Sequence, residues 1–201
     1  MRLGIFGGSF DPVHIGHCWI AEAAIETLQL ERVHWIPAAT SPLKVGGPVA
    51  SAEDRLAMLH LALSGCERHA IDDREIRRGE LSFTVDTVAE YCDEHPGARV
   101  IFIIGSDSLA TIRQWHRPEE LLRIATPAVV QRGGQPEIDF SVLDGLIDQQ
   151  RIQQVRQHVI NMPVIELSSS ELRSRLARNR SIRYRTPRAV EALIDANQLY
   201  R

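Results

Sequence analysis

The chain has 201 residues, of which 44% are hydrophobic and 24% are charged, a composition ordinary for one sizeable globular domain. Its formal net charge of -3 argues against a general nucleic-acid-binding protein. No apolar run approaches the ~20 residues of a membrane-spanning helix, and no signal peptide precedes the first apolar segment. The three cysteines are widely spaced and form no metal-binding pattern. We therefore expect a cytoplasmic protein with no membrane or nucleic-acid partner and no protein-bound structural metal.

Strand-like and helix-like segments alternate through the first half of the chain. Residues 3–6 form an apolar run typical of a buried strand, and residues 19–25 are typical of a helix. Residues 33–36 predict a second strand, which Pro37 closes. Ser51 then begins a capping-box pattern, and the helix after it is expected to bury its leucines, Leu61 among them.

The second half continues the alternation. Residues 100–104 predict the clearest strand, because they are apolar at every position, as in a central parallel strand. Further strands are predicted at 128–130 and 164–165, and helices at about 85–91, 143–158, 170–177 and 187–197.

This alternation predicts an α/β fold: a Rossmann-like, doubly wound parallel sheet with helices on both faces. We expect a single domain over 1–201, with a small helical portion at about 166–201. In such sheets, ligands bind beyond the carboxyl ends of the strands, where the strand order reverses.

The stretch 7–17 reads Gly-Gly-Ser-Phe-Asp-Pro-Val-His-Ile-Gly-His and lies between the first strand and the first helix. A glycine-rich turn before a helix leaves backbone N–H groups free at the positive end of the helix dipole, which favours a phosphate. His14 and His17 are three residues apart and share one face, and Gly16 allows a ligand to approach the backbone.

This stretch resembles the His-x-Gly-His signature of the nucleotidylyltransferase superfamily, which transfers a nucleotidyl group from a nucleoside triphosphate to a phosphorylated acceptor. The resemblance implies that His14 and His17 are catalytic and bind the triphosphate. It implies ATP contacts at the neighbouring positions Gly7, Gly8, Ser9, Phe10 and Gly16.

A second motif lies far along the chain, at 167–173, Leu-Ser-Ser-Ser-Glu-Leu-Arg. It resembles the Ile-Ser-Ser-Thr-x-Ile-Arg motif of the same superfamily, with hydroxyl and apolar character kept at each changed position. The resemblance implies ATP-phosphate contacts at Ser168, Ser169, Ser170 and a catalytic Arg173. By residue type alone, a serine N-cap beside a solvated arginine is the competing interpretation.

Lys44 and Arg55, which both follow the second strand, match the superfamily less distinctly than the two motifs do. Lys44 follows a proline in the loop, and the resemblance implies that it is catalytic and reaches the reacting phosphates of both substrates. Arg55 also matches a family position, although a surface salt bridge on the helix is an equal alternative.

Further motifs resemble one branch of the superfamily, the nicotinate-nucleotide adenylyltransferases. Ser82-Phe83-Thr84 implies a pyridine site near Thr84, and Gly105 and Asp107 imply contacts to the adenosine. The remaining positions implied to bind nicotinate mononucleotide are Ser9, Trp115, whose indole would stack on the ring, His116 and Arg132.

The resemblance implies adenylyl transfer from ATP to nicotinate mononucleotide, with Mg²⁺ held mainly by the ATP phosphates. Nicotinamide mononucleotide or phosphopantetheine as acceptor remain alternatives. A non-enzymatic nucleotide or RNA sensor is a third, because the segment 173–188 carries seven arginines and no acid. An ion-paired helix face explains that segment equally, and a homo-oligomer is left open.

Overall fold

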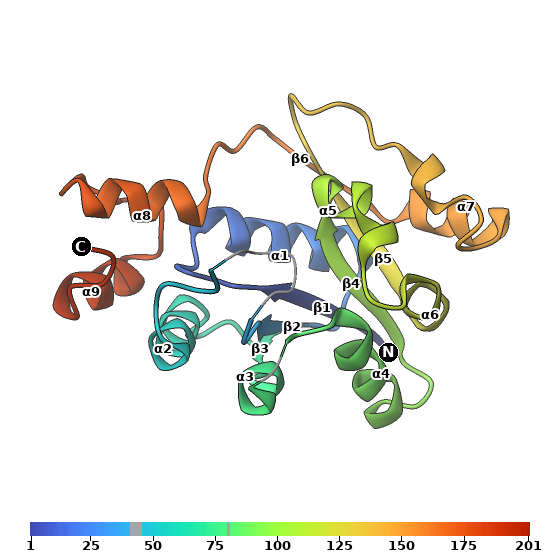
Figure 1. Ribbon diagram of the computed structural model, residues 1–201, viewed down its shortest axis with the longest axis horizontal. Coiled ribbons are helices and arrows are strands. Elements are labelled where there is room, and N and C mark those ends of the chain that lie inside the picture. Colours follow the sequence, from blue (N-terminus) through green and yellow to red (C-terminus); the bar gives the residue numbers. More distant parts are fainter. Residues whose placement is uncertain (41–45, 80) are drawn as a thin grey trace.

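The computed structural model describes residues 1–40, 46–79 and 81–201, and within them six strands form one parallel sheet (Figure 1). The strands are β1 Arg2–Gly8, β2 Arg32–Pro37, β3 His69–Ile71, β4 Arg99–Gly105, β5 Thr126–Arg132 and β6 Val159–Met162. They lie in the order β3-β2-β1-β4-β5-β6, and every neighbouring pair is parallel. The order reverses between β1 and β4, so a ligand site is expected at their carboxyl ends.

Helices cover both faces of this sheet. The α-helices are α1 Ile15–Leu28, α2 Ala52–Ala62, α3 Arg74–Arg78, α4 Thr84–Glu94, α5 Ser106–Ala110, α6 Pro118–Ile124, α7 Gln149–Gln157, α8 Ser169–Ala177 and α9 Arg188–Ala196, and two 3₁₀ turns are η1 Ile112–Gln114 and η2 Phe140–Leu143. None of the described helices has the length and apolar character needed to cross a bilayer.

Two hydrophobic cores lie on the two faces of the sheet because successive strand residues point to opposite sides. Phe6 belongs to the core that includes residues of α1, α2, α8 and α9. Its neighbour Ile5 belongs to the core that includes residues of α4, α6 and α7. The expected doubly wound α/β fold is therefore confirmed, and Figure 1 shows α8 and α9 together at one end of the molecule.

Three local expectations were wrong. The last strand is Val159–Met162 rather than 164–165, and it ends where Pro163 cannot donate a backbone N–H to the ladder. The helix expected from residue 143 begins only at Gln149, after Asp148 caps it. Leu61 is 39% exposed, because the buried face of α2 is formed by other residues of that helix.

Candidate functional site

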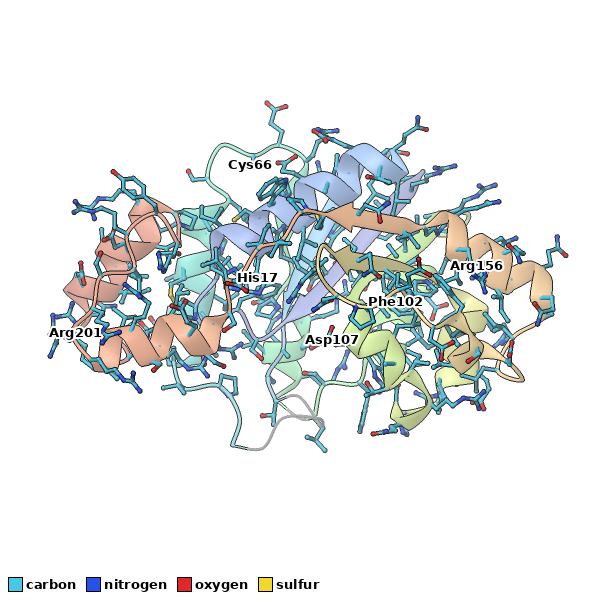
Figure 2. The ribbon with its side chains drawn as sticks, turned by 90° about the horizontal axis from the view of Figure 1, so that it is seen from above. His17, Cys66, Phe102, Asp107, Arg156 and Arg201 are labelled. Carbon is cyan, nitrogen blue, oxygen red and sulfur yellow. The ribbon has the colours of Figure 1, made fainter. Side chains whose placement is uncertain are left out.

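The two motif histidines open helix α1 and cap it together. The Nδ1 of His14 accepts a hydrogen bond from the backbone N–H of His17 at 3.3 Å, and the N–H of His14 donates to the Nδ1 of His17 at 3.2 Å. The rings stack with centroids 3.6 Å apart. Figure 2 shows His17 near the middle of the molecule, between Arg201 at one end and Arg156 at the other. The shared face expected from the spacing is therefore present.

The cap also determines which ring atom of each histidine can donate. Both Nδ1 atoms accept hydrogen bonds, so in the neutral imidazoles of His14 and His17 the proton lies on Nε2. Two Nε2–H groups held on one stacked face suit the oxygens of a polyphosphate.

Burial keeps His14 in this neutral form. Its side chain is only 5% exposed, and desolvation, assisted by the positive charge of Arg132, lowers its pKa to about 4. Gly16 makes room for the ring, because a Cβ at that position would lie 3.1 Å from two atoms of the His14 imidazole. The glycine of the motif therefore serves the placement of its first histidine.

We expect the low pKa of His14 to make the protein less stable in acid. Unfolding returns this histidine to its ordinary pKa of 6.5, so the unfolded chain binds more protons and stability falls as the pH drops from 6.5 towards 4. The full difference between these two pKa values corresponds to a loss of about 3 kcal/mol in the free energy of unfolding. Denaturant unfolding at several pH values measures this loss in the protein and in a His14→Asn variant, which keeps a helix cap. If the unfolding free energies of both proteins fall equally between pH 6.5 and 4, His14 does not cause the loss.

The serine motif folds back onto the loop that carries the histidines. The Ser169 hydroxyl donates to the carbonyl oxygen of Pro12 at 2.9 Å, and the Nη1 of Arg173 donates to that of Asp11 at 2.6 Å. Ser170 accepts a hydrogen bond from Arg173 at 3.3 Å. Ser168 caps α8 by accepting from the Glu171 N–H, so the N-cap is present, although Arg173 is bonded to Asp11 rather than solvated. Phosphate binding by this motif stays a prediction.

Asp11 is the buried centre of this junction. Its carboxylate accepts hydrogen bonds from the N–H groups of Val49 and Ala50 at 2.7 and 3.1 Å and from the Tyr200 hydroxyl at 2.7 Å. Arg173 lies 3.7 Å from the same carboxylate. Asp11 therefore ties the loop before α2, the carboxyl terminus and the serine motif to the histidine loop.

Arg55 provides a second link between strand ends. It is 2% exposed, and its Nη1 donates to the carbonyl oxygens of Ser9 and Ala38 at 2.9 and 2.8 Å. The surface salt bridge was therefore the wrong alternative for Arg55. Phe10 is also buried, with its ring 5.2 Å from that of His17, and its contact with ATP stays a prediction.

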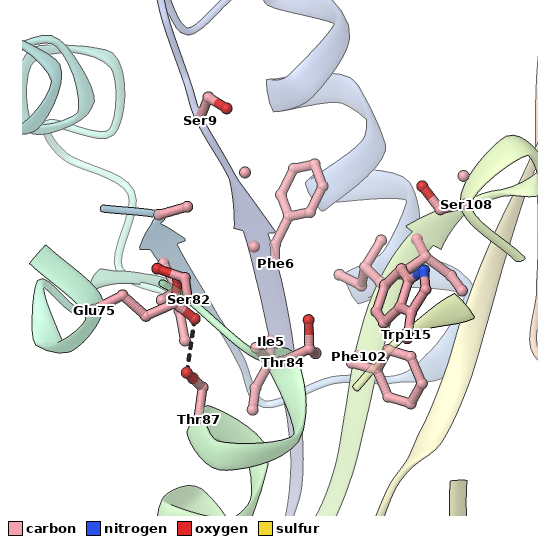
Figure 3. Close-up of a pocket in the computed structure, with 17 residues that line it drawn as sticks. Ile5, Phe6, Ser9, Glu75, Ser82, Thr84, Thr87, Phe102, Ser108 and Trp115 are labelled. Atoms are coloured by element: carbon pink, nitrogen blue, oxygen red, sulfur yellow. Dashed lines mark hydrogen bonds between the residues drawn. The ribbon is translucent and has the colours of Figure 1, made fainter. Parts of the chain in front are cut away.

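A pocket of about 350 Å³ opens at the carboxyl ends of β1, β2 and β4 (Figure 3). Trp115 lines one side of it, and Glu75 and Thr87 line the other. The Thr87 hydroxyl donates to Glu75 at 2.6 Å, whereas the buried Nε1 of Trp115 has no hydrogen-bond partner among the described residues. A flat apolar wall with an unpaired donor is suited to a ring that carries an acceptor.

The other predicted residues divide between this pocket and its surroundings. The residues of the prediction that line the pocket are Gly7, Gly8, Ser9, Thr84, Gly105 and Trp115. Asp107 is exposed just beyond the pocket, with its carboxylate folded back over Gly105. The His116 ring packs 4.3 Å from that of Phe83, and Arg132 lines a small hollow beside His14 instead. Lys44 lies outside the described residues.

Part of the arginine-rich segment is used in ion pairs. Arg175 and Arg185 lie 3.7 and 3.9 Å from Glu171, and Arg188 lies 2.7 Å from Glu191. These contacts favour an ion-paired helix face over an RNA-binding patch.

The sequence matches the model of the cytidylyltransferase-like family over residues 5–175. The chain belongs to the cytidylyltransferase-like family. A relative from Rhodopirellula baltica, named a probable nicotinate-nucleotide adenylyltransferase, is 52% identical over 99% of this chain and 93% of its own length. A relative of the same name from Thermomicrobium roseum is 40% identical over 100% of this chain and 92% of its own length. These relatives place the chain in the nicotinate-nucleotide adenylyltransferase branch.

A solved structure confirms the fold of this cytidylyltransferase-like chain. The nicotinic acid mononucleotide adenylyltransferase of Plasmodium falciparum, complexed with NaAD, superposes with a TM-score of 0.75. The two chains are 19% identical, and the match covers 99% of this chain and 97% of the other.

Sequence reasoning on this family member missed three residues of the site. Asp11 and Tyr200 were not assigned a role in the site, and Glu75 was not recognised as a pocket residue. Their roles depend on contacts between distant segments. The Tyr200 hydroxyl, for example, bonds Asp11 across 189 positions of the chain.

Proposed function

We propose that this chain transfers the adenylyl group of ATP to nicotinate mononucleotide, giving deamido-NAD and pyrophosphate. One observation carries the proposal: Ser169 and Arg173 of α8 hydrogen-bond directly to the Asp11–Pro12 loop, which leads into the His14–His17 cap beside the pocket that Trp115 lines. The names of the full-length relatives from Rhodopirellula baltica and Thermomicrobium roseum support it.

In the proposed reaction, an oxygen of the acceptor phosphate attacks the α-phosphorus of ATP. The bond from that phosphorus to the bridging oxygen breaks, and pyrophosphate leaves with the electron pair. The protein needs no covalent nucleophile, because its work is to align two anions and neutralise the charge that develops. The Nε2–H groups of His14 and His17 donate to the α- and β-phosphates, and Arg173 holds the departing pyrophosphate.

Mg²⁺ fits this site as part of the bound nucleotide rather than as an ion with protein ligands. The Asp11 carboxylate already accepts three hydrogen bonds and faces Arg173. No cluster of three metal-ligating side chains occurs in the described part of the chain. Such an ion shields phosphate charge and keeps several of its waters.

The pocket supports a pyridine ring with a carboxylate. Thr84 lines it as the first residue of α4, so the positive end of that helix faces the pocket and favours an anion. Trp115 offers the ring a π-face.

All three cysteines, Cys18, Cys66 and Cys92, are free thiols, which supports our further proposal that the enzyme works in the reducing cytoplasm.

The decisive experiment measures pyrophosphate release from ATP and Mg²⁺ with each acceptor in turn. We expect nicotinate mononucleotide to give the highest kcat/KM, with a dinucleotide product of the expected mass. Nicotinamide mononucleotide and phosphopantetheine are the competing acceptors, and a reaction without acceptor measures simple hydrolysis. Faster release with either competitor would contradict the proposed acceptor, and release equal to the acceptor-free rate in all cases would contradict transferase activity.

A further inference from the structure

A second cavity lies at the amino ends of the strands, on the opposite side of the sheet's length from the nucleotide site. It has a volume of about 580 Å³ and is lined by Arg2, Arg99 and Thr126, which begin β1, β4 and β5, and by His158, just before β6. We call it the strand-start cavity. A strand of seven residues spans ~23 Å, so this cavity is well separated from the carboxyl ends of the same strands.

The strand-start cavity is strongly cationic. Four arginines line it, Arg2, Arg99, Arg123 and Arg151, and none of the described residues that line it is an aspartate or glutamate. Among the described residues, none of these four guanidinium groups forms an ion pair within 4 Å, in contrast to Arg74 or Arg188. Four positive charges around one hollow repel each other unless an anion lies between them.

The neighbouring acids do not neutralise this charge. Asp148 favours the charged form of Arg151 from outside the lining, and Glu31 accepts a hydrogen bond from the backbone N–H of Arg2 rather than from its guanidinium. Arg2 and Arg99 are also direct partners in the β1–β4 register, and like charges at such positions destabilise a sheet.

His158 adds an unused hydrogen-bonding atom. Its Nδ1 is buried and has no partner within the described structure. Burial lowers the pKa of this histidine, and the positive charges of Arg2, Arg151 and Arg99 lower it further. An unpaired buried nitrogen is destabilising unless a ligand or water completes it.

We propose that the strand-start cavity binds a compact phosphate-bearing anion, such as pyrophosphate or a small phosphorylated metabolite, between Arg99, Arg123 and His158. Planar guanidinium groups match phosphate oxygens in paired hydrogen bonds. The volume exceeds what one orthophosphate needs, but among the described residues no phenylalanine, tyrosine or tryptophan lines the cavity to hold a nucleobase. The ligand is therefore a small polyanion, and this site is additional to the nucleotide site.

The test follows the ring nitrogen resonances of His158 by NMR while inorganic pyrophosphate is added at constant ionic strength maintained with NaCl. This local readout separates the cavity from the nucleotide site, which is also expected to bind pyrophosphate. We expect a saturable shift at His158, and an Arg99→Gln variant should bind about tenfold more weakly there.

The matched control is Arg156→Gln, which removes the same charge from α7, where Arg156 packs over the Phe140 ring instead of lining the cavity. It should leave the affinity at His158 unchanged. Arg123→Gln, at another exposed arginine, repeats the test if the first variant folds poorly. No saturable shift at His158, or equal weakening by Arg99→Gln and Arg156→Gln, would overturn the proposal.

Discussion

Replacing His17 with alanine should lower kcat for adenylyl transfer by roughly 10²–10³-fold, the scale of losing one preorganised donor to transition-state charge. The hydrogen bond from the His14 N–H to the His17 Nδ1 fixes that donor on Nε2. Steady-state kinetics with saturating ATP and acceptor measures kcat directly, and the loss should appear in kcat more than in the KM for ATP.

The matched control is His60→Ala, at an exposed histidine in the last turn of α2. It should leave kcat unchanged. His17→Ala also removes one partner of the α1 cap, so its unfolding free energy is expected to fall by about 1 kcal/mol. A folded His17→Ala protein with near-normal kcat would rule out the catalytic role of His17.

Replacing Asp11 with asparagine should have the second large effect. An amide in place of the carboxylate presents N–H donors where Val49, Ala50 and Tyr200 also donate, and it removes the negative charge beside Arg173. We expect the free energy of unfolding to fall by about 3 kcal/mol, because Asp11 is only 3% exposed. A displaced Arg173 should also lower kcat by roughly 10²-fold.

Two further variants separate these effects. Asp93→Asn makes the same chemical change at an exposed position of α4 and should alter neither stability nor kcat. Tyr200→Phe removes one hydrogen bond of Asp11 and should lower the unfolding free energy by about 1 kcal/mol. If Asp11→Asn unfolds at the same denaturant concentration as the unchanged protein and keeps its kcat, Asp11 does not hold the site together.

Local patterns in the sequence predicted the elements that carry strong signals. The apolar run 100–104 predicted β4, and Ser51 predicted the start of α2, where its hydroxyl accepts from the Asp54 N–H at 3.0 Å. Short elements with mixed polarity had no such signal. Helix α6 and the true position of β6 at Val159–Met162 were missed, because their few residues alternate weakly and pack mainly through tertiary contacts.

The sequence by itself determined the fold class and located the two motifs that we predict to bind phosphate, because hydrophobic period, glycine turns and helix caps act over a few neighbouring residues. Only the tertiary structure decided that Ser169 and Arg173 meet the loop of Pro12 and Asp11, about 160 positions away along the chain. It also decided that Arg55 is a buried link and that Tyr200 completes the Asp11 junction. Such contacts depend on how the strands are ordered in the sheet, which no local pattern encodes.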